Sequence, residues 1–127
     1  MKSPHTGLKR IFYAALYSWK GFVATWKEEA AFRQEVVLFA LMLPLAFWLG
    51  ETVVERVLLI GVLLIVLIVE LLNSSLETVV DRISEDYHPL SGRAKDQASA
   101  AVFVSFALAI LVWGGFVLDK LSNYWVA

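Results

Sequence analysis

The sequence contains no cysteine, only three prolines, and a formal net charge of −1 over 127 residues. Without cysteine, the chain can form neither disulfide bonds nor thiolate metal sites. Without an excess of positive charge, it has nothing to offset nucleic-acid phosphates, so we expect no nucleic acid among its partners. The sequence also lacks a Walker loop, a glycine-rich kinase loop and a His-Arg-Asp motif. None of the common nucleotide-binding motifs is therefore available to identify a function.

Apolar residues, by contrast, dominate the chain. Hydrophobic side chains make up 59% of the sequence, which includes five tryptophans, and the mean hydropathy is +0.68. This composition predicts a small, all-helical integral membrane protein. A soluble helical bundle is the alternative, because the apolar run Val57–Val69 has only 13 residues. The 21 uncharged residues 98–118 argue against it, since a bundle of this size could not cover three such surfaces.

The first predicted helix, over residues 8–27, is amphipathic. Apolar and Trp side chains recur on one face, and cations and tyrosines recur on the other. This pattern is typical of a helix that lies in the membrane interface. A cleaved signal peptide is the alternative, but no uninterrupted apolar segment follows the early charges.

Three further helices are predicted to span the membrane, over residues 30–50, 53–84 and 92–120, and together with the surface helix they form a single membrane domain. Pro44 is expected to kink the first span, which Gly50 ends. Thr52 and Glu55 form a capping box that starts the second span, and Ser91 is expected to cap the third. The N-terminal segment holds six basic residues and the second turn region three, so the positive-inside rule places both in the cytoplasm.

The second spanning helix carries a polar face near its cytoplasmic end. Glu70, Asn73, Ser74, Glu77 and Asp81 fall at offsets of 0, 3, 4, 7 and 11, which places them on one side of the helix. Glu70 and Glu77 are separated by about 10 Å along that face. An ionisable residue inside an apolar segment is functional by default, although Glu70 could also be a structural carboxyl that bonds to a neighbouring helix.

Two other charged residues, Glu29 and Lys95, fall near the same membrane surface as Glu77. The carboxylates of Glu29 and Glu77 could share a hard divalent cation, and the Lys95 ammonium could act as a point charge on a phosphate. All three would face the compartment that contains ATP. Each of them alone could equally be a solvated surface charge.

Three motifs place these residues in a common context. They are Ala-Ala-Phe-Arg-Gln-Glu at 30–35, Val-Glu-x-x-Asn-Ser-x-x-Glu-x-Val-Val-Asp-Arg at 69–82, and Ser-Gly-Arg-Ala-Lys-Asp-x-x-Ser-Ala-Ala at 91–101. Together with Tyr17-Ser18-Trp19-Lys20-Gly21, they make the chain resemble the prokaryotic diacylglycerol kinases over residues 7–113. Pro44, Gly114-Gly115 and the tail from Phe116 are not features of that pattern.

The resemblance implies a homotrimer in the bacterial inner membrane, with its N-terminus in the cytoplasm and active sites shared between neighbouring chains. It implies ATP-dependent phosphorylation of diacylglycerol to phosphatidic acid at the cytoplasmic membrane interface, with Mg²⁺ accompanying ATP. Glu70 would be the catalytic base, Glu29 and Glu77 would hold the metal, and Asn73 and Asp81 would complete the polar face. The implied nucleotide-binding positions are Arg10, Tyr17, Glu29, Glu77, Asp86, Tyr87, His88, Lys95 and Asp96. The implied lipid-substrate positions are Arg10, Ala14, Trp19, Val23, Trp26, Ala31, Phe32, Arg33, Gln34, Glu35, Trp48, Arg56, Glu70, Ser99 and Trp113.

Three other functions remain compatible with the residues. A related kinase would use undecaprenol as the acceptor, and parallel assays with the two lipids would separate these readings. Glu70 could instead be an ion-coupling carboxylate in a small channel or transporter, which would show flux without nucleotide turnover. A non-catalytic membrane scaffold would consume no ATP with any lipid alcohol, and it would leave Glu29, Glu77 and Lys95 without a combined purpose.

Overall fold

The computed structural model of the protein describes residues 5–126, and they form four helices joined by short turns. The helices are α1 (Gly7–Glu28), α2 (Ala30–Leu49), α3 (Val53–Ile83) and α4 (Pro89–Val126). Helices α2, α3 and α4 are each long and apolar enough to cross a membrane. The predicted fold class, an all-helical membrane protein with an N-terminal helix and three candidate spans, is confirmed.

Helices α2 and α3 form an antiparallel hairpin with a turn of only three residues, 50–52. The Glu55 amide donates to Thr52 Oγ1 over 3.1 Å, so Thr52 caps α3 as predicted. The Arg56 side chain reaches back and donates to the carbonyls of Phe47 (3.3 Å) and Gly50 (3.1 Å), which are left unpaired at the end of α2. A glycine is required at position 50 because the Arg56 side chain packs closely against it: a Cβ there would lie 2.8 Å from Arg56 Cγ. Pro44 lies within α2, which continues to Leu49.

The last helix begins earlier and runs further than the expected residues 92–120, since α4 spans Pro89–Val126. Proline suits the first position of a helix, because its fixed φ is already helical and no amide hydrogen is needed there. His88 Nδ1 accepts a hydrogen bond from the Leu90 amide over 3.1 Å, and the His88 carbonyl accepts from Gly92 over 3.0 Å. His88 therefore takes the capping role expected of Ser91, which lies inside the helix instead.

The packed interior is small and lies between the three long helices. One cluster consists of Phe39, Val62, Leu63, Val66 and Ala109, and a second consists of Ala46, Leu49 and Leu59. Trp113 of α4 packs against both clusters, and its indole Nε1 donates to the Leu59 carbonyl of α3 over 3.0 Å. Most other apolar side chains of these helices are exposed, as is expected of surfaces that face lipid.

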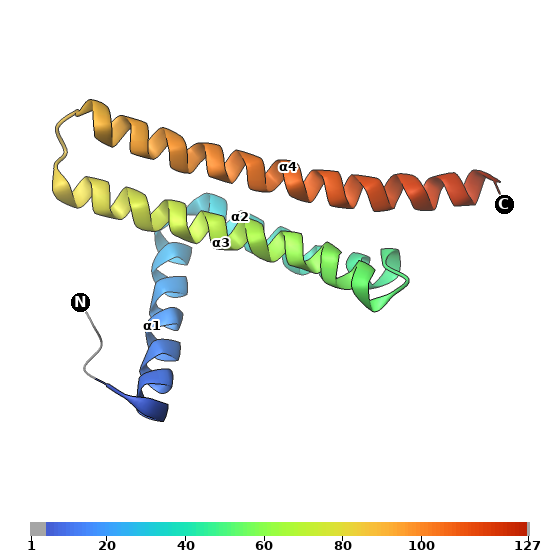
Figure 1. Cartoon of the computed structure of the whole chain (residues 1–127), viewed down its shortest axis with the longest axis horizontal. Helices are drawn as coiled ribbons and strands as arrows, with labels where there is room; N and C mark the ends of the chain where they lie inside the picture. Colours follow the sequence, from blue (N-terminus) through green and yellow to red (C-terminus); the bar gives the residue numbers. More distant parts are fainter. Residues whose placement is uncertain (1–4, 127) are drawn as a thin grey trace.

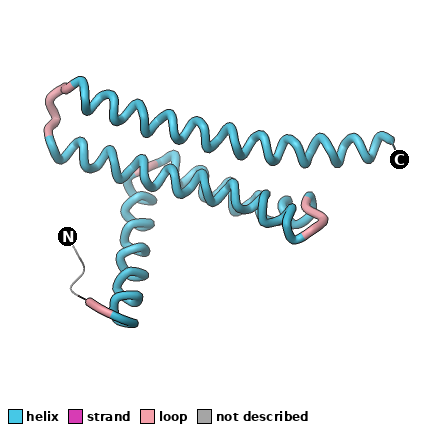
Figure 2. The backbone as a smooth tube through the Cα atoms, viewed as in Figure 1, coloured by secondary structure: helices cyan, strands magenta, loops and turns pink. Residues whose placement is uncertain are grey.

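Helix α1 leaves the bundle at the start of α2 and runs roughly perpendicular to α3 and α4, which lie side by side (Figure 1). The tube view shows the same arrangement, with one short connection at each end of α3 (Figure 2). Arg33 Nη1 donates to the carbonyls of Trp26 (2.6 Å) and Lys27 (3.2 Å), and it thereby caps the end of α1. If the three long helices cross a bilayer, this orientation lays α1 along its surface.

Lys120 joins the far end of α4 to the end of α2. Its ammonium donates to the Trp48 carbonyl over 3.0 Å and lies 3.9 Å from the centroid of the Trp48 ring. The pair combines a hydrogen bond with a cation–π contact. It fixes α4 against the α2–α3 hairpin at the end opposite to α1.

Candidate active site

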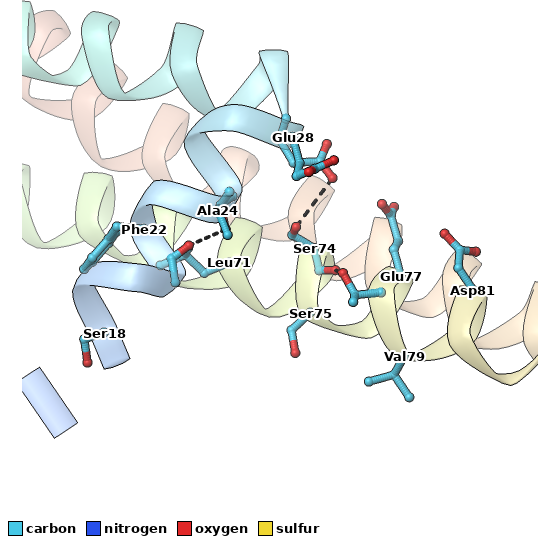
Figure 3. Close-up of a pocket in the computed structure, with 14 residues that line it drawn as sticks. Ser18, Phe22, Ala24, Glu28, Leu71, Ser74, Ser75, Glu77, Val79 and Asp81 are labelled. Carbon is cyan, nitrogen blue, oxygen red and sulfur yellow. Dashed lines mark hydrogen bonds between the residues drawn. The ribbon is translucent and has the colours of Figure 1, made fainter. Parts of the chain in front are cut away.

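The polar face of α3 lines a groove between α1 and α3, which we call the first groove. Its acidic lining residues are Glu28, Glu29, Glu77 and Asp81. Small residues such as Gly21 and Ser75 also line it. Figure 3 shows the carboxylates of Glu77 and Asp81 on the side of α3 where Ser74 meets the end of α1, while Ser75 and Val79, which also line the groove, project from the other side of the helix. The groove is therefore open, acidic and polar along one wall.

Two hydrogen bonds organise the centre of this groove. Ser74 Oγ donates to Glu29 Oε1, and Asn73 Nδ2 donates to Glu77 Oε1, both over 3.4 Å. Glu29 lies between α1 and α2, so the first bond ties the α1–α2 junction to α3. The Asn73 Oδ1 atom is buried and has no hydrogen-bond partner. An amide oxygen is thus left unsatisfied next to the Glu77 carboxylate.

Glu70 lies deeper in the bundle and faces Glu35 of α2. Both side chains are half-buried and lie close to each other. Glu35 Oε2 is buried and has no hydrogen-bond partner, and a proton shared with Glu70 would satisfy it. The sequence placed Glu35 among the lipid-substrate positions and gave no sign of this pairing.

A second groove lies at the turn between α3 and α4. It is lined by four of the predicted nucleotide-binding residues, namely Asp86, Tyr87, His88 and Lys95. Asp81 also lines it, and Lys95 Nζ donates to Asp81 Oδ1 over 2.9 Å. The structure therefore brings Glu29, Glu77, Asp81 and Lys95 into one continuous region.

The other predicted nucleotide-binding residues lie outside this region of the same chain. Arg10 and Tyr17 are exposed on α1, and neither lines the first or the second groove. The Tyr17 ring instead lies 6.2 Å from the Tyr13 ring at an interplanar angle of 35°, and Lys20 Nζ lies 5.9 Å from the centroid of the Tyr17 ring. Asp96 is exposed on α4 beside Lys95.

The predicted lipid-substrate residues are spread along the whole bundle. Those nearest to Glu70 lie at the α1–α2 junction, where Phe32 is buried, Arg33 caps α1, and the others are Ala31, Gln34 and Glu35. Ala14, Trp19, Val23 and Trp26 lie along α1, and Ser99 is exposed on α4. Trp48 and Arg56 lie at the opposite end of the α2–α3 hairpin, and Trp113 is bonded to Leu59 between α3 and α4.

The sequence did not single out Glu28, although this residue lines the first groove beside Glu29. The signal was the Glu28-Glu29 pair at the end of an otherwise basic and apolar helix. Among residues 5–126, no group of three or more His, Asp or Glu side chains is arranged to hold a metal ion. Any cation bound at Glu29 and Glu77 must therefore take further ligands from elsewhere.

The fold and the site together define a small helical membrane protein with three candidate spans and an acidic, ligand-accessible site at one end of its apolar bundle. The sequence profile of the prokaryotic diacylglycerol kinase family matches residues 16–117. The chain belongs to the prokaryotic diacylglycerol kinase family.

Individual relatives agree with this assignment. A diacylglycerol kinase of Escherichia coli K12 is 52% identical over 113 residues, which cover 89% of this chain and 93% of the relative. The corresponding values for a diacylglycerol kinase of Pseudomonas aeruginosa are 50%, 89% and 92%. A diacylglycerol kinase of Helicobacter pylori is 42% identical, with 88% of each chain covered. The family recognised from the three sequence motifs is confirmed, and with it the prediction of a membrane-bound diacylglycerol kinase.

Proposed function

We propose that the protein transfers the γ-phosphoryl group of ATP to the free hydroxyl of diacylglycerol, giving phosphatidic acid, at the cytoplasmic face of the bacterial inner membrane. The observation that carries this proposal is the continuous polar region from Glu70 to Lys95 at one end of an apolar bundle, in a chain of this family. Phosphoryl transfer depends mostly on positioning and charge stabilisation, and this region offers both.

The depth of the two central carboxylates suits the two substrates. Glu70 lies 17 residues after Val53, which is about 26 Å along α3 at about 1.5 Å per residue. The hydrocarbon core is about 30 Å thick, so Glu70 falls near its cytoplasmic boundary, where a lipid hydroxyl resides. Glu77 lies about 10 Å further along the helix, where a water-soluble nucleotide can reach it.

Glu70 is the base in this proposal. Its carboxylate takes the proton from the lipid hydroxyl, the hydroxyl oxygen forms the new bond to the γ-phosphorus, and the bond to the ADP oxygen breaks. Glu35 lies close to Glu70, and a proton shared between the two carboxyl groups would hold the Glu70 carboxyl in place. The Lys95 ammonium lies on the nucleotide side, where it offsets phosphate charge.

The residues around the first groove fit a magnesium ion. Mg²⁺ is usually held by one or two carboxylates together with substrate phosphates and water, so Glu29 and Glu77 suffice without a third acidic residue. The unsatisfied, buried Asn73 Oδ1 beside Glu77 would supply a further hard oxygen ligand. When bound there, the metal would neutralise charge on the phosphates. Ser74 orients Glu29, and Asn73 Nδ2 orients Glu77.

The proposed assembly is a homotrimer with active sites shared between chains. Its support is that one chain leaves much of its apolar helix surface exposed and does not bring Arg10 or Tyr17 to either groove. The number of chains rests on the family resemblance alone.

The test of the proposed roles compares two isosteric variants in the same detergent. Glu70→Gln should leave the affinity for magnesium ATP nearly intact while turnover falls by roughly 10²–10⁴, the range of general-base contributions. Glu77→Gln should weaken magnesium ATP binding, because a hard ligand loses its charge. Glu51→Gln, an exposed residue at the opposite end of the bundle, is the matched control.

The measurements are nucleotide titration and turnover with diacylglycerol and with other lipid alcohols. Full turnover in Glu70→Gln, or a loss of nucleotide affinity as severe as in Glu77→Gln, would refute its assignment as the base. Much faster phosphorylation of undecaprenol than of diacylglycerol would refute the substrate.

A further inference from the structure

Asp81 occupies the boundary between the two grooves. It is the acidic residue that lines both of them, one helical turn beyond Glu77 on α3. A ligand whose polyphosphate extends from the second groove toward Glu77 in the first must therefore pass this side chain. The residue is highly exposed, so it is accessible from both sides.

Asp81 makes a single ion pair, with Lys95 of α4. The Nζ–Oδ1 distance is 2.9 Å, and the pair connects α3 to α4 across the turn at residues 84–88. Its side chains remain 42% (Lys95) and 66% (Asp81) exposed. Exposed pairs of this kind contribute little to stability, so this one matters little for holding the helices together. A phosphate oxygen can therefore accept a hydrogen bond from the Lys95 ammonium with little loss of stability.

The pair does, however, restrict a flexible side chain. A free lysine side chain has many rotamers, and part of this conformational entropy is lost whenever its ammonium is fixed by a ligand. Its ammonium has three donors, so Lys95 can keep its bond to Asp81 while it donates to another oxygen. Holding the ammonium beforehand reduces the entropy that the nucleotide must overcome on binding.

We propose that Asp81 is a positioning residue: it holds the Lys95 ammonium at the boundary of the two grooves, so that an arriving nucleotide phosphate meets a lysine already in place. This inference rests on the proposed function, because it takes the ligand to be a nucleoside triphosphate. Asp81 acts through Lys95 and does not touch the phosphate. Without Lys95, the negative charge of Asp81 would repel a polyphosphate. Asp81 therefore favours nucleotide binding only through its contact with Lys95.

The experiment is a double-mutant cycle on Asp81 and Lys95 in the full-length protein. Asp81→Asn should raise the KM for magnesium ATP about two- to fivefold with kcat nearly unchanged, which corresponds to up to about 1 kcal/mol. Lys95→Ala should raise KM further. In the Lys95→Ala background, Asp81→Asn should cause no further loss, because the residue it positions is gone. Asp81→Glu keeps the carboxylate and should restore most of the affinity.

The matched control is Asp119→Asn, which makes the same substitution on α4, away from both grooves. Asp119 is exposed and has no hydrogen bond or ion pair in the described part of the chain, so KM should stay at the wild-type value. Thermal unfolding of each variant checks the fold, and the unfolding midpoint of Asp81→Asn should stay within a few degrees of wild type.

Three results would overturn the inference. They are additive losses in the double variant, an equal rise in KM for Asp119→Asn, and no rescue by Asp81→Glu. If the wild type binds magnesium ATP but phosphorylates no diacylglycerol, the proposed function fails alone, and the cycle is then read from nucleotide titration. If the wild type phosphorylates diacylglycerol and the losses are additive, the inference fails alone. A wild type that binds no nucleotide would overturn both.

Discussion

Replacing Trp113 by Phe tests whether this tryptophan stabilises the bundle or serves the lipid substrate. The family resemblance assigns Trp113 to the lipid side. In the structure its indole donates to the Leu59 carbonyl over 3.0 Å, and its ring packs against both apolar clusters. Phenylalanine keeps an aromatic ring at the site but removes the donor and part of the volume. The variant therefore probes the contact between α3 and α4 directly.

The expected loss of stability has two parts. A hydrogen bond between membrane helices contributes about 0.6 kcal/mol on average and about 1.7 kcal/mol at most. The smaller ring leaves a void of roughly 40 Å³, which at about 24 cal/mol per Å³ adds roughly 1 kcal/mol. The Leu59 carbonyl keeps its helical amide partner, so no acceptor is orphaned. The free energy of unfolding should fall by about 1.5–2.5 kcal/mol.

The assay is reversible denaturant titration in mixed micelles, run beside steady-state kinetics with varied diacylglycerol. Trp125→Phe is the matched control, because Trp125 is 81% exposed near the end of α4 and should change stability by less than about 0.5 kcal/mol. If Trp113→Phe is as stable as Trp125→Phe while its KM for diacylglycerol rises, the packing argument is refuted and Trp113 serves the lipid.

Two further changes test the turn and the assembly. Gly50→Ala should destabilise by about 1–3 kcal/mol, because its Cβ would meet Arg56 at 2.8 Å, whereas Gly61→Ala meets nothing within 4 Å and should be neutral or stabilising by up to about 1 kcal/mol. Thermal unfolding of the two variants measures this difference, and equal midpoints would contradict it. Mixing Glu70→Gln chains with Arg10→Ala chains should restore some turnover if a neighbouring chain supplies Arg10, because a mixed oligomer then contains sites with an intact Glu70 and an intact Arg10. No restoration at any ratio would indicate self-contained sites.

The sequence predicted the features that depend on residues near one another in the chain. The apolar runs indicated the three long helices, and the three-residue spacing of Thr52 and Glu55 indicated the cap that the structure shows. The polar face of α3 followed from helical periodicity, which holds Glu70 and Glu77 on one side whatever the neighbouring helices do. These predictions needed no knowledge of how the helices pack.

The contacts that the sequence did not predict depend on where the chain turns. Arg33 and Arg56 carry no local sign that they cap the helices preceding them, because their reach depends on the path of each turn. His88 displaced Ser91 as the cap because Pro89 fixed an earlier start for α4. The Lys95–Asp81 pair requires the axial alignment of α3 and α4, which the intervening turn determines.

The residues assigned by resemblance divide into two groups that have different physical surroundings. In the first group, Glu29, Glu77 and Lys95 each make a hydrogen bond to a residue of α3 in the same chain. The second group points outward, as shown by the exposed fractions of Tyr17 (50%), Trp19 (67%) and Trp48 (65%). Tryptophan and tyrosine at a membrane surface are satisfied by lipid headgroups or by another protein surface. If both groups act on one pair of substrates, the second must come from a neighbouring chain or contact the lipid substrate itself, and the mixing experiment separates these two cases.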